Sequence, residues 1–325
     1  MSNVEPIVLP DLPIVDSHHH LWLRPGSRYL LDEFAADLAG GHNVTATVCV
    51  ESGAMYRRSG PLAMQPVGEA EFVAGMAAMS ASGLFGPTEV GAAFVGAADL
   101  TIGPAVDEVL DALARASGDR LRGIRVNVAW DADPNINPGG RPHAPPGLLS
   151  DANFRAGFGR LAARGLSYDA WQYHPQLPEL CNLADAFPGV PIIVNHCGGP
   201  LGVGAYARPD TFARWQALVV DAARRPNMVM KLGGIARQRC GFSFEDRPIP
   251  PSARELAQAW RPYIETCIDA FGPARCMFGS NFPPDGVAGS YGTIWNAFKL
   301  ATLGCTDAER SELFSGTARR VYRIV

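Results

Sequence analysis

The sequence predicts an α/β protein, a single (β/α)8 TIM barrel with loops inserted at its active-site end. Short apolar runs alternate with helix-length segments rich in Ala, Leu, Glu and Arg, eight such runs can be counted, and polar side chains follow several of them. Alternation of this kind requires a parallel sheet, and eight units favour a closed barrel over an open doubly wound sheet. The pattern alone leaves the open sheet as the alternative.

The composition agrees with one large buried core. The chain has 325 residues, of which 47% are hydrophobic and 18% charged. Barrels of this type commonly run to about 250 residues or more as one unit. We therefore expect one domain over residues 1–325, with a barrel core at about 12–323.

The charge pattern excludes several kinds of partner. The chain carries 28 basic and 32 acidic residues mixed along its length, so it has no basic stripe for nucleic acid. No apolar run reaches the roughly 18 residues of a membrane helix, and residues 1–10 lack the pattern of a secretory signal. We expect a cytoplasmic protein without membrane partners that forms a homo-oligomer.

The expected strands are short and mostly apolar, as parallel strands buried on both faces are. They span 13–16, 46–50, 90–95, 123–128, 166–171, 192–195, 228–232 and 276–279. Helix-length segments lie between them, among them 69–82, 105–116, 211–224 and 253–270. The tail at 316–325 is expected to form a last helix that closes the barrel.

Two proline-containing insertions, 131–149 and 237–252, interrupt this rhythm. Both follow expected strands. In a barrel such loops project from the carboxyl ends of the strands, where active sites and lids are built. The insertion 237–252 is therefore expected to cover the site.

The strongest chemical signal is a histidine cluster at the end of the first expected strand. His18, His19 and His20 follow an apolar run and precede Leu21 and Trp22. Residues two apart on a strand share a face, so His18 and His20 are expected to point together into the barrel mouth while His19 faces outward. Two imidazoles placed in this way can serve one metal ion or one polar substrate.

With this motif the sequence resembles the amidohydrolase superfamily, in its branch of lactonase-like hydrolases and related decarboxylases that open with D-x-H-x-H-x-W. Residues 121–125, 195–200 and 277–283 are similar to the fourth, sixth and eighth strands of that branch. The likeness spans nearly the whole chain, from Ile14 to Tyr322. It is specific for the superfamily and weak for the substrate.

Two further histidines are candidates for the same site. His196 ends the apolar run 192–194 and precedes two glycines that allow close approach of a ligand, so we expect it to bind a metal or polarise a carbonyl. The resemblance implies another histidine ligand after the fifth strand, which is His174; a loop position that contacts substrate is the alternative. The expected cofactor is one divalent ion, zinc or manganese, on His18, His20, His174 and His196, with catalysis without a metal as the alternative.

Charged residues at other strand ends are candidates for substrate binding. Arg125 lies inside an apolar run, where a guanidinium needs an anionic partner. A substrate carboxylate and a barrel carboxylate are equal alternatives for that partner. Glu51 and Lys231 end the second and seventh expected strands, and Trp22 follows the histidine cluster.

The eighth strand departs from the pattern of the branch. Many of its members have an aspartate as metal ligand and general base where this chain has Asn281. An amide cannot take a proton from water at neutral pH. The expected replacement is Asp285, four residues on in a segment stiffened by two prolines.

The resemblance implies a hydrolase that opens a small carboxylate-bearing lactone or related cyclic ester by attack of water, with His196, Asn281 and Asp285 in the catalytic centre. Metal-dependent non-oxidative decarboxylation is the runner-up. A barrel that binds its ligand without turning it over is the third alternative, because Asn281 replaces the expected base.

Overall fold

A ring of parallel strands forms the centre of the computed structural model, which describes residues 5–136 and 143–325. Its eight strands pair in chain order. Asn281 N donates to His18 O at 2.7 Å and His20 N to Phe282 O at 2.8 Å, which closes the ring between the first and last strands. The strands are β1 (Ile14–His19), β4 (Val44–Val50), β5 (Glu89–Gly96), β6 (Leu121–Asn127), β7 (Ser167–Trp171), β8 (Ile192–Val194), β9 (Met228–Leu232) and β10 (Cys276–Phe278). The predicted barrel is confirmed.

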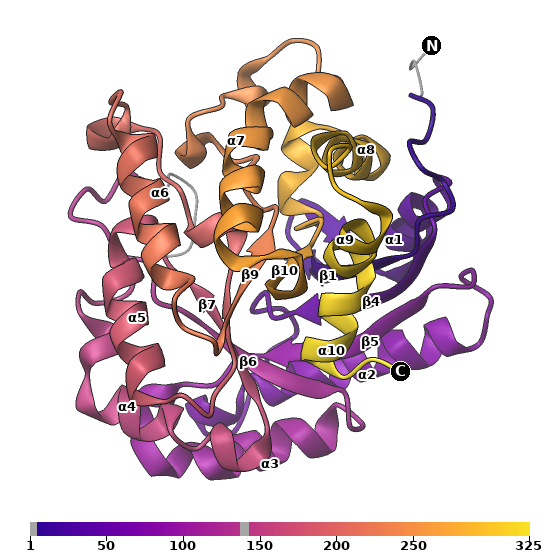
Figure 1. Cartoon of the computed structure of the whole chain (residues 1–325). Helices are drawn as coiled ribbons and strands as arrows, with labels where there is room; N and C mark the ends of the chain where they lie inside the picture. The colour runs from indigo at the N-terminus through magenta and orange to yellow at the C-terminus, as the bar shows by residue number, and fades with distance from the viewer. Residues whose placement is uncertain (1–4, 137–142) are drawn as a thin grey trace.

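Helices surround these strands, as Figure 1 shows. They are α1 (Leu31–Leu38), α2 (Val67–Ala81), α3 (Val106–Ala116), α4 (Ala152–Phe158), α5 (Leu177–Ala186), α6 (Thr211–Ala222), α7 (Ala253–Phe271), α8 (Tyr291–Ala301), α9 (Asp307–Ser311) and α10 (Thr317–Tyr322). The expected helical segments match α2, α3, α6 and α7. A small hairpin of β2 (Trp22–Arg24) and β3 (Ser27–Tyr29), which the pattern did not predict, follows the histidine cluster.

The last helix closes the barrel, as expected, and it contributes to the barrel interior. Ala318 and Tyr322 pack with the small apolar side chains that strands β1, β4, β5 and β8 point inward. The Tyr322 hydroxyl donates to both carboxylate oxygens of Asp169, at 2.9 and 3.1 Å. Lys231 Nζ pairs with the same carboxylate at 2.8 Å. The buried cation and anion of the interior therefore neutralise each other, as burial requires.

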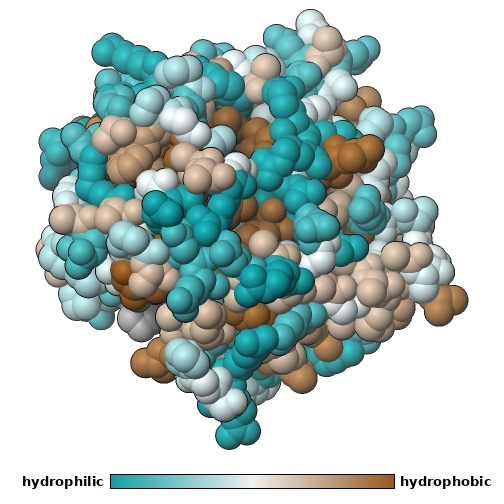
Figure 2. All heavy atoms as spheres, turned by 90° about the horizontal axis from the view of Figure 1, so that it is seen from below, coloured by the Kyte–Doolittle hydropathy of each residue, from teal (hydrophilic) through white to brown (hydrophobic). Residues whose placement is uncertain are grey.

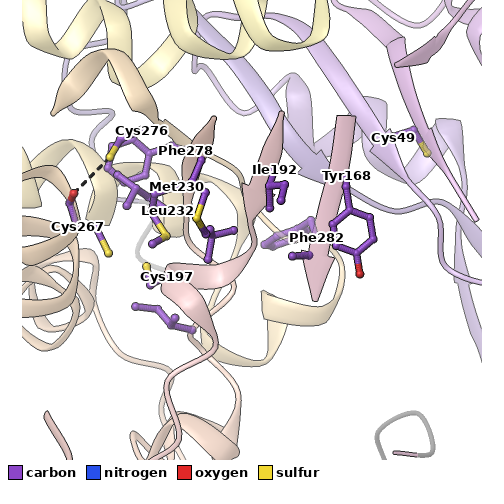
Figure 3. Close-up of a cluster of buried hydrophobic side chains, with 14 of the residues drawn as sticks. Cys49, Tyr168, Ile192, Cys197, Met230, Leu232, Cys267, Cys276, Phe278 and Phe282 are labelled. Carbon is purple, nitrogen blue, oxygen red and sulfur yellow. Dashed lines mark hydrogen bonds between the residues drawn. The ribbon is translucent and has the colours of Figure 1, made fainter. Parts of the chain in front are cut away.

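A second apolar layer lies between the strands and the helices. Figure 3 shows part of it around β8, β9 and β10, where Met230, Leu232 and Phe278 are buried together. Cys197, Cys267 and Cys276 lie in the same cluster, and the thiol of Cys276 donates to the carbonyl of Cys267 at 3.5 Å. These cysteines fill the layer as small apolar side chains.

The two insertions are anchored by their contacts. Asp131 accepts a hydrogen bond from the Tyr206 hydroxyl at 2.6 Å, while residues 137–142 of the insertion 131–149 lie outside the described residues. In the insertion 237–252, Phe242 and Phe244 stack at 5.3 Å, and Phe244 lies edge-on to Trp260 of α7. The second insertion is thus packed against helix α7.

The face seen from below is largely polar. From below (Figure 2), hydrophilic residues cover much of the face, and hydrophobic residues show as small separate areas between them. Within the described residues, no helix combines the length and the apolar character needed to cross a membrane.

Candidate active site

A cavity of about 570 Å³ opens where the carboxyl ends of the strands meet their loops. Its charged and polar lining is Arg24, Arg125, Arg237, Arg239, His20, His196, Asn127, Asn281, Ser27 and Ser52. Its aromatic lining is Trp22, Trp171 and Tyr173. Among the described residues no carboxylate lines it. The cavity lies at the end of the barrel where enzymes of this fold place their sites.

The structure brings together three of the predicted histidines. The ring of His18 lies with its centroid 5.0 Å from that of His20 and 4.6 Å from that of His196. His19 faces the other way, with its ring on Phe34 of α1 and its Nε2 2.9 Å from the Thr47 hydroxyl. The alternation of side chains along β1 thus places His18 and His20 at the barrel mouth, as predicted.

The backbone at the end of β8 has an uncommon conformation. His196 and Cys197 have φ of 55° and 51°, in the left-handed region that side chains disfavour. Asn281 has the same conformation, with φ of 51°. Gly234 follows β9, and a Cβ there would coincide with the imidazole of His196. A bare backbone at Gly234 is therefore what leaves room for the His196 ring.

Burial keeps two of these histidines neutral. Desolvation, and then the nearby charge of Arg239, place the pKa of His196 well below its ordinary value. Desolvation, and then Lys231, do the same to the pKa of His18. At neutral pH both rings are uncharged, so each can donate one hydrogen bond and accept another.

Arg125 has a barrel carboxylate as its partner. Its Nε lies 2.8 Å from Glu51 Oε1, both side chains are buried, and its Nη2 donates to the Glu51 carbonyl. Nη1 lies 3.2 Å from His18 Nε2. Of the two alternatives for the partner of Arg125, the structure contains the internal ion pair. Arg125 also lines the cavity, while Glu51 lies behind it.

The arrangement of His18, His20 and His196 does not fit a metal ion held by three protein donors. The guanidinium of Arg125 donates toward His18 Nε2, the lone pair that a metal would need. Across the described ranges, no group of three or more His, Cys, Asp or Glu side chains has the geometry to hold an ion. Lys231 and Arg125 also place positive charge around His18. We therefore assign no step of the chemistry to a metal.

Asn281 and Asp285 form a pair at the end of β10. Asn281 Nδ2 donates to Asp285 Oδ1 at 2.7 Å. Asn281 lines the cavity, whereas Asp285 is 1% exposed and lies behind the amide. Burial raises the pKa of Asp285 to about 6, against the opposing effect of the Asn281 hydrogen bond. This carboxyl group changes its protonation close to neutral pH.

The structure does not bring the remaining predicted residues to the cavity. His174 lines a second cavity of about 290 Å³, and its Nδ1 accepts from Leu201 N at 3.2 Å. Lys231 is inside the barrel on Asp169. His174 therefore joins neither the other histidines nor the main cavity.

Sequence reasoning missed Arg237, Arg239 and Trp171. The two arginines fall in the insertion 237–252, which the sequence predicts only as a cover for the site, although loops that follow barrel strands are the usual place for binding groups. Arg237 and Arg239 stand two residues apart just after the segment 233–236. This spacing could have indicated that both side chains serve the same site. Trp171 lies edge-on to His196 with a centroid distance of 4.9 Å, although its place in the sequence predicts only the end of a strand.

Comparison with known proteins identifies the family of the chain. The model of the amidohydrolase family matches residues 15–324. An uncharacterized protein of Sinorhizobium fredii, y4mH, is 31% identical over 97% of this chain and 100% of its own length. The L-fucono-1,5-lactonase of Burkholderia multivorans is 30% identical over 72% of each chain.

A solved structure extends the likeness to three dimensions. A zinc-bound amidohydrolase from Burkholderia multivorans superposes with a TM-score of 0.74 at 26% identity, over 96% of this chain and 99% of that one. The family model covers nearly the whole barrel, including the strand ends that carry His18, His196 and Asn281. The chain belongs to the amidohydrolase family.

Proposed function

We propose that this protein hydrolyses a small lactone, with water as the attacking group. The observation that carries the proposal is the meeting of His18, His20 and His196, of which His20 and His196 line the cavity together with other polar and cationic groups. The lactonase name of a relative with 30% identity supports the same reaction. The runner-up, decarboxylation, has no separate observation in the site that favours it.

The reaction needs a group that stabilises the carbonyl oxygen as it gains charge. His196 lines the cavity and is neutral, so its N–H can donate to that oxygen without a proton being lost. Water oxygen bonds to the carbonyl carbon, and the bond from that carbon to the ring oxygen then breaks. The ring oxygen leaves as a hydroxyl after taking back the proton that the base removed from the water, and the new carboxylic acid releases its proton to solvent, so the product is an open hydroxy carboxylate.

The proton of the attacking water needs an acceptor, which we assign to Asp285. A general base is most effective when its pKa lies near the working pH, and the pKa of about 6 meets that condition. Asn281 stands between this carboxyl group and the cavity, and its amide is oriented by the 2.7 Å contact. Asp285 can take the proton only when this amide turns aside, because a general base must reach its water within hydrogen-bond distance.

The proposal is tested with a panel of five- and six-membered sugar lactones, followed by proton release in a weakly buffered pH-indicator assay. His196→Gln is expected to lower kcat by about 100-fold or more, the scale of losing one oxyanion donor. His174→Gln serves as the matched histidine control and should retain activity. If no lactone is hydrolysed although ligands bind, the barrel that binds without turnover replaces this proposal.

A further inference from the structure

The cavity has a one-sided charge that the proposed hydrolysis does not use. Four arginines line it, and within the described residues no aspartate or glutamate does. Positive groups around a partly enclosed cavity focus an attractive potential on anions. Which of these guanidiniums is available to a ligand depends on the partners that each already has in the protein.

Two of the four are already engaged by the protein. Arg125 uses Nε and Nη2 on Glu51 and faces His18 with Nη1. Arg24 donates to the Ser52 carbonyl at 2.5 Å, and its guanidinium carbon lies 4.2 Å from the ring centroid of Trp22. Because both guanidiniums already have contacts within the protein, neither is the first candidate for binding an anionic ligand.

Arg239 is different, because it is buried without a matching carboxylate. It is 7% exposed, and its Nη2 makes only a long contact of 3.3 Å with the Gly234 carbonyl. Its Nε is cut off from solvent and has no hydrogen-bond partner in the described parts of the chain. No described carboxylate lies within 4.0 Å of it; Asp285 acts on it only at longer range. A guanidinium desolvated in this way is costly until an anion pairs with it.

The position of Arg239 relates it to the reacting centre. Its guanidinium carbon lies 4.8 Å from the ring centroid of Trp171, and the same indole contacts His196 at 4.9 Å. Arg237, two residues earlier, lines the cavity and makes one weak contact, 3.4 Å to the Pro284 carbonyl. Arg239 and His196 thus contact the same indole. An anionic group bound to Arg239 would therefore lie near a carbonyl polarised by His196.

We infer that Arg239, assisted by Arg237, binds an oxyanion substituent of the substrate, so that the lactone turned over by this protein carries a carboxylate or phosphate remote from its ester. That the substrate is a lactone rests on the proposed function. That it carries an anionic group rests on Arg239 alone. The planar guanidinium suits both oxyanions, because its donors match their oxygen atoms. The experiment separates the two sources.

Binding is measured first, without any turnover. Titration calorimetry compares glutarate, inorganic phosphate and the neutral 1,5-pentanediol. Arg239→Met should weaken the preferred anion about 30-fold or more, as loss of one partner of a buried charge pair does, and leave pentanediol unchanged. Arg239→Met should keep or raise Tm, since it removes a desolvated charge, whereas a structural arginine would lower it. Arg214→Met on the exposed face of α6 is the matched control.

Turnover is measured second, on lactone pairs that differ in one group. D-glucono-1,4-lactone and D-glucaro-1,4-lactone differ only by a terminal carboxylate; glucono-1,5-lactone and its 6-phosphate test the phosphate arm. Arg239→Met is expected to raise KM for the anionic member about 30-fold and to change the neutral member less than about three-fold. Should Arg239→Met not fold, Arg239→Lys and Arg237→Met are read in the same way.

The two proposals fail in different ways. If neutral and anionic lactones are hydrolysed equally well by the wild type and by Arg239→Met, the anion subsite is overturned and the hydrolase stands. If glutarate or phosphate binding depends on Arg239 but no lactone is opened, the subsite stands and the hydrolase falls.

Discussion

At the scale of single residues, the site depends on groups whose charge is set by burial. His18 and His196 are neutral because desolvation lowers their pKa, and Asp285 is poised because desolvation raises its pKa to about 6. The same physical cause thus produces neutral donors and a usable base. Which role a group takes follows from whether its charged form is the acid or the base.

Asp285→Asn tests the base. The folded-state pKa of Asp285 is raised from 3.8 to about 6, so the wild-type kcat should fall as pH drops through 6 and the base is protonated. The variant should lose about 100-fold or more in kcat, and that inflection should disappear from the pH profile. The raised pKa also means that ionisation of Asp285 costs stability as pH rises through 6, so Asp285→Asn should be no less stable at pH 8.

Asn281→Asp is the companion variant, and it should add little. If Asp285→Asn instead keeps kcat and its pH profile while losing roughly 1 kcal/mol of stability, the carboxylate only supports the amide of Asn281. If Asn281→Asp greatly raises hydrolysis of a poorly active protein, the native chain is better described as a binding barrel.

The contact between Arg125 and His18 predicts how the enzyme responds to metal removal. Nη1 of Arg125 faces His18 Nε2 and so occupies the lone pair that a metal would need. Dialysis against a chelator should therefore leave kcat within about two-fold of that of the untreated enzyme. Loss of a required Lewis acid would instead raise the activation free energy by several kcal/mol. Metal content measured on protein purified without chelator gives the comparison. A proportional loss of zinc or manganese and of activity, restored by adding the ion back, would contradict the assignment.

At the scale of elements, neighbouring strand ends position the site together. Asp16 in β1 accepts hydrogen bonds from Ser280 N, the Ser280 hydroxyl and the Tyr291 hydroxyl, at 2.9, 2.6 and 3.0 Å. These bonds fasten β1 to the segment after β10, so the histidines of one and Asn281 of the other keep their separation. The segment after β9 meets the end of β8 by close packing, since Gly234 leaves the space that the His196 ring fills.

Gly234→Ala tests the contact between β9 and β8. The new methyl group would coincide with the His196 ring, and φ of 69° at Gly234 is itself unfavourable for alanine. We expect kcat to fall at least as far as in His196→Gln, with a lower Tm. Gly75→Ala is the matched control, because Gly75 lies within α2 with open space around it and should gain up to about 1 kcal/mol. Full activity in Gly234→Ala would show that His196 is not required.

The sequence was sufficient for what depends on periodicity and insufficient for what depends on tertiary contacts. Eight apolar runs predicted eight strands, and the spacing of His18 and His20 predicted their common face. The partner of Arg125 could not be chosen, because Glu51 lies 74 positions away and meets it only in the folded barrel. The position of His174 could not be predicted for the same reason, since the loop after β7 turns it toward the second cavity.

At the scale of the whole molecule, the buried polar contacts of the barrel interior join distant parts of the chain. Asp169 in β7 receives Lys231 from β9 and the hydroxyl of Tyr322 from α10. Arg122 in β6 donates to the Tyr322 carbonyl at 2.8 Å. The helix after the last strand is therefore part of the barrel core.

Tyr322→Phe measures that connection. Removing the hydroxyl leaves the buried Asp169 carboxylate with one donor fewer, which should lower the free energy of unfolding by about 1 to 3 kcal/mol. Activity should be retained, because the contact lies away from the cavity. Urea denaturation gives the measurement, and Tyr206→Phe, which deletes a more exposed bond to Asp131, should cost less. An equal effect in both variants would contradict a special role for the interior contact.

The left-handed backbone at His196, Cys197 and Asn281 has an evolutionary consequence. Each such residue holds a conformation that costs on the order of 1 kcal/mol or more and that glycine adopts freely. In a library selected for thermal stability alone, glycine should therefore accumulate at positions 196 and 281, and catalysis should be lost with it. Selection for turnover is therefore needed to keep histidine at position 196 and asparagine at position 281, because the backbone conformation at both positions favours glycine.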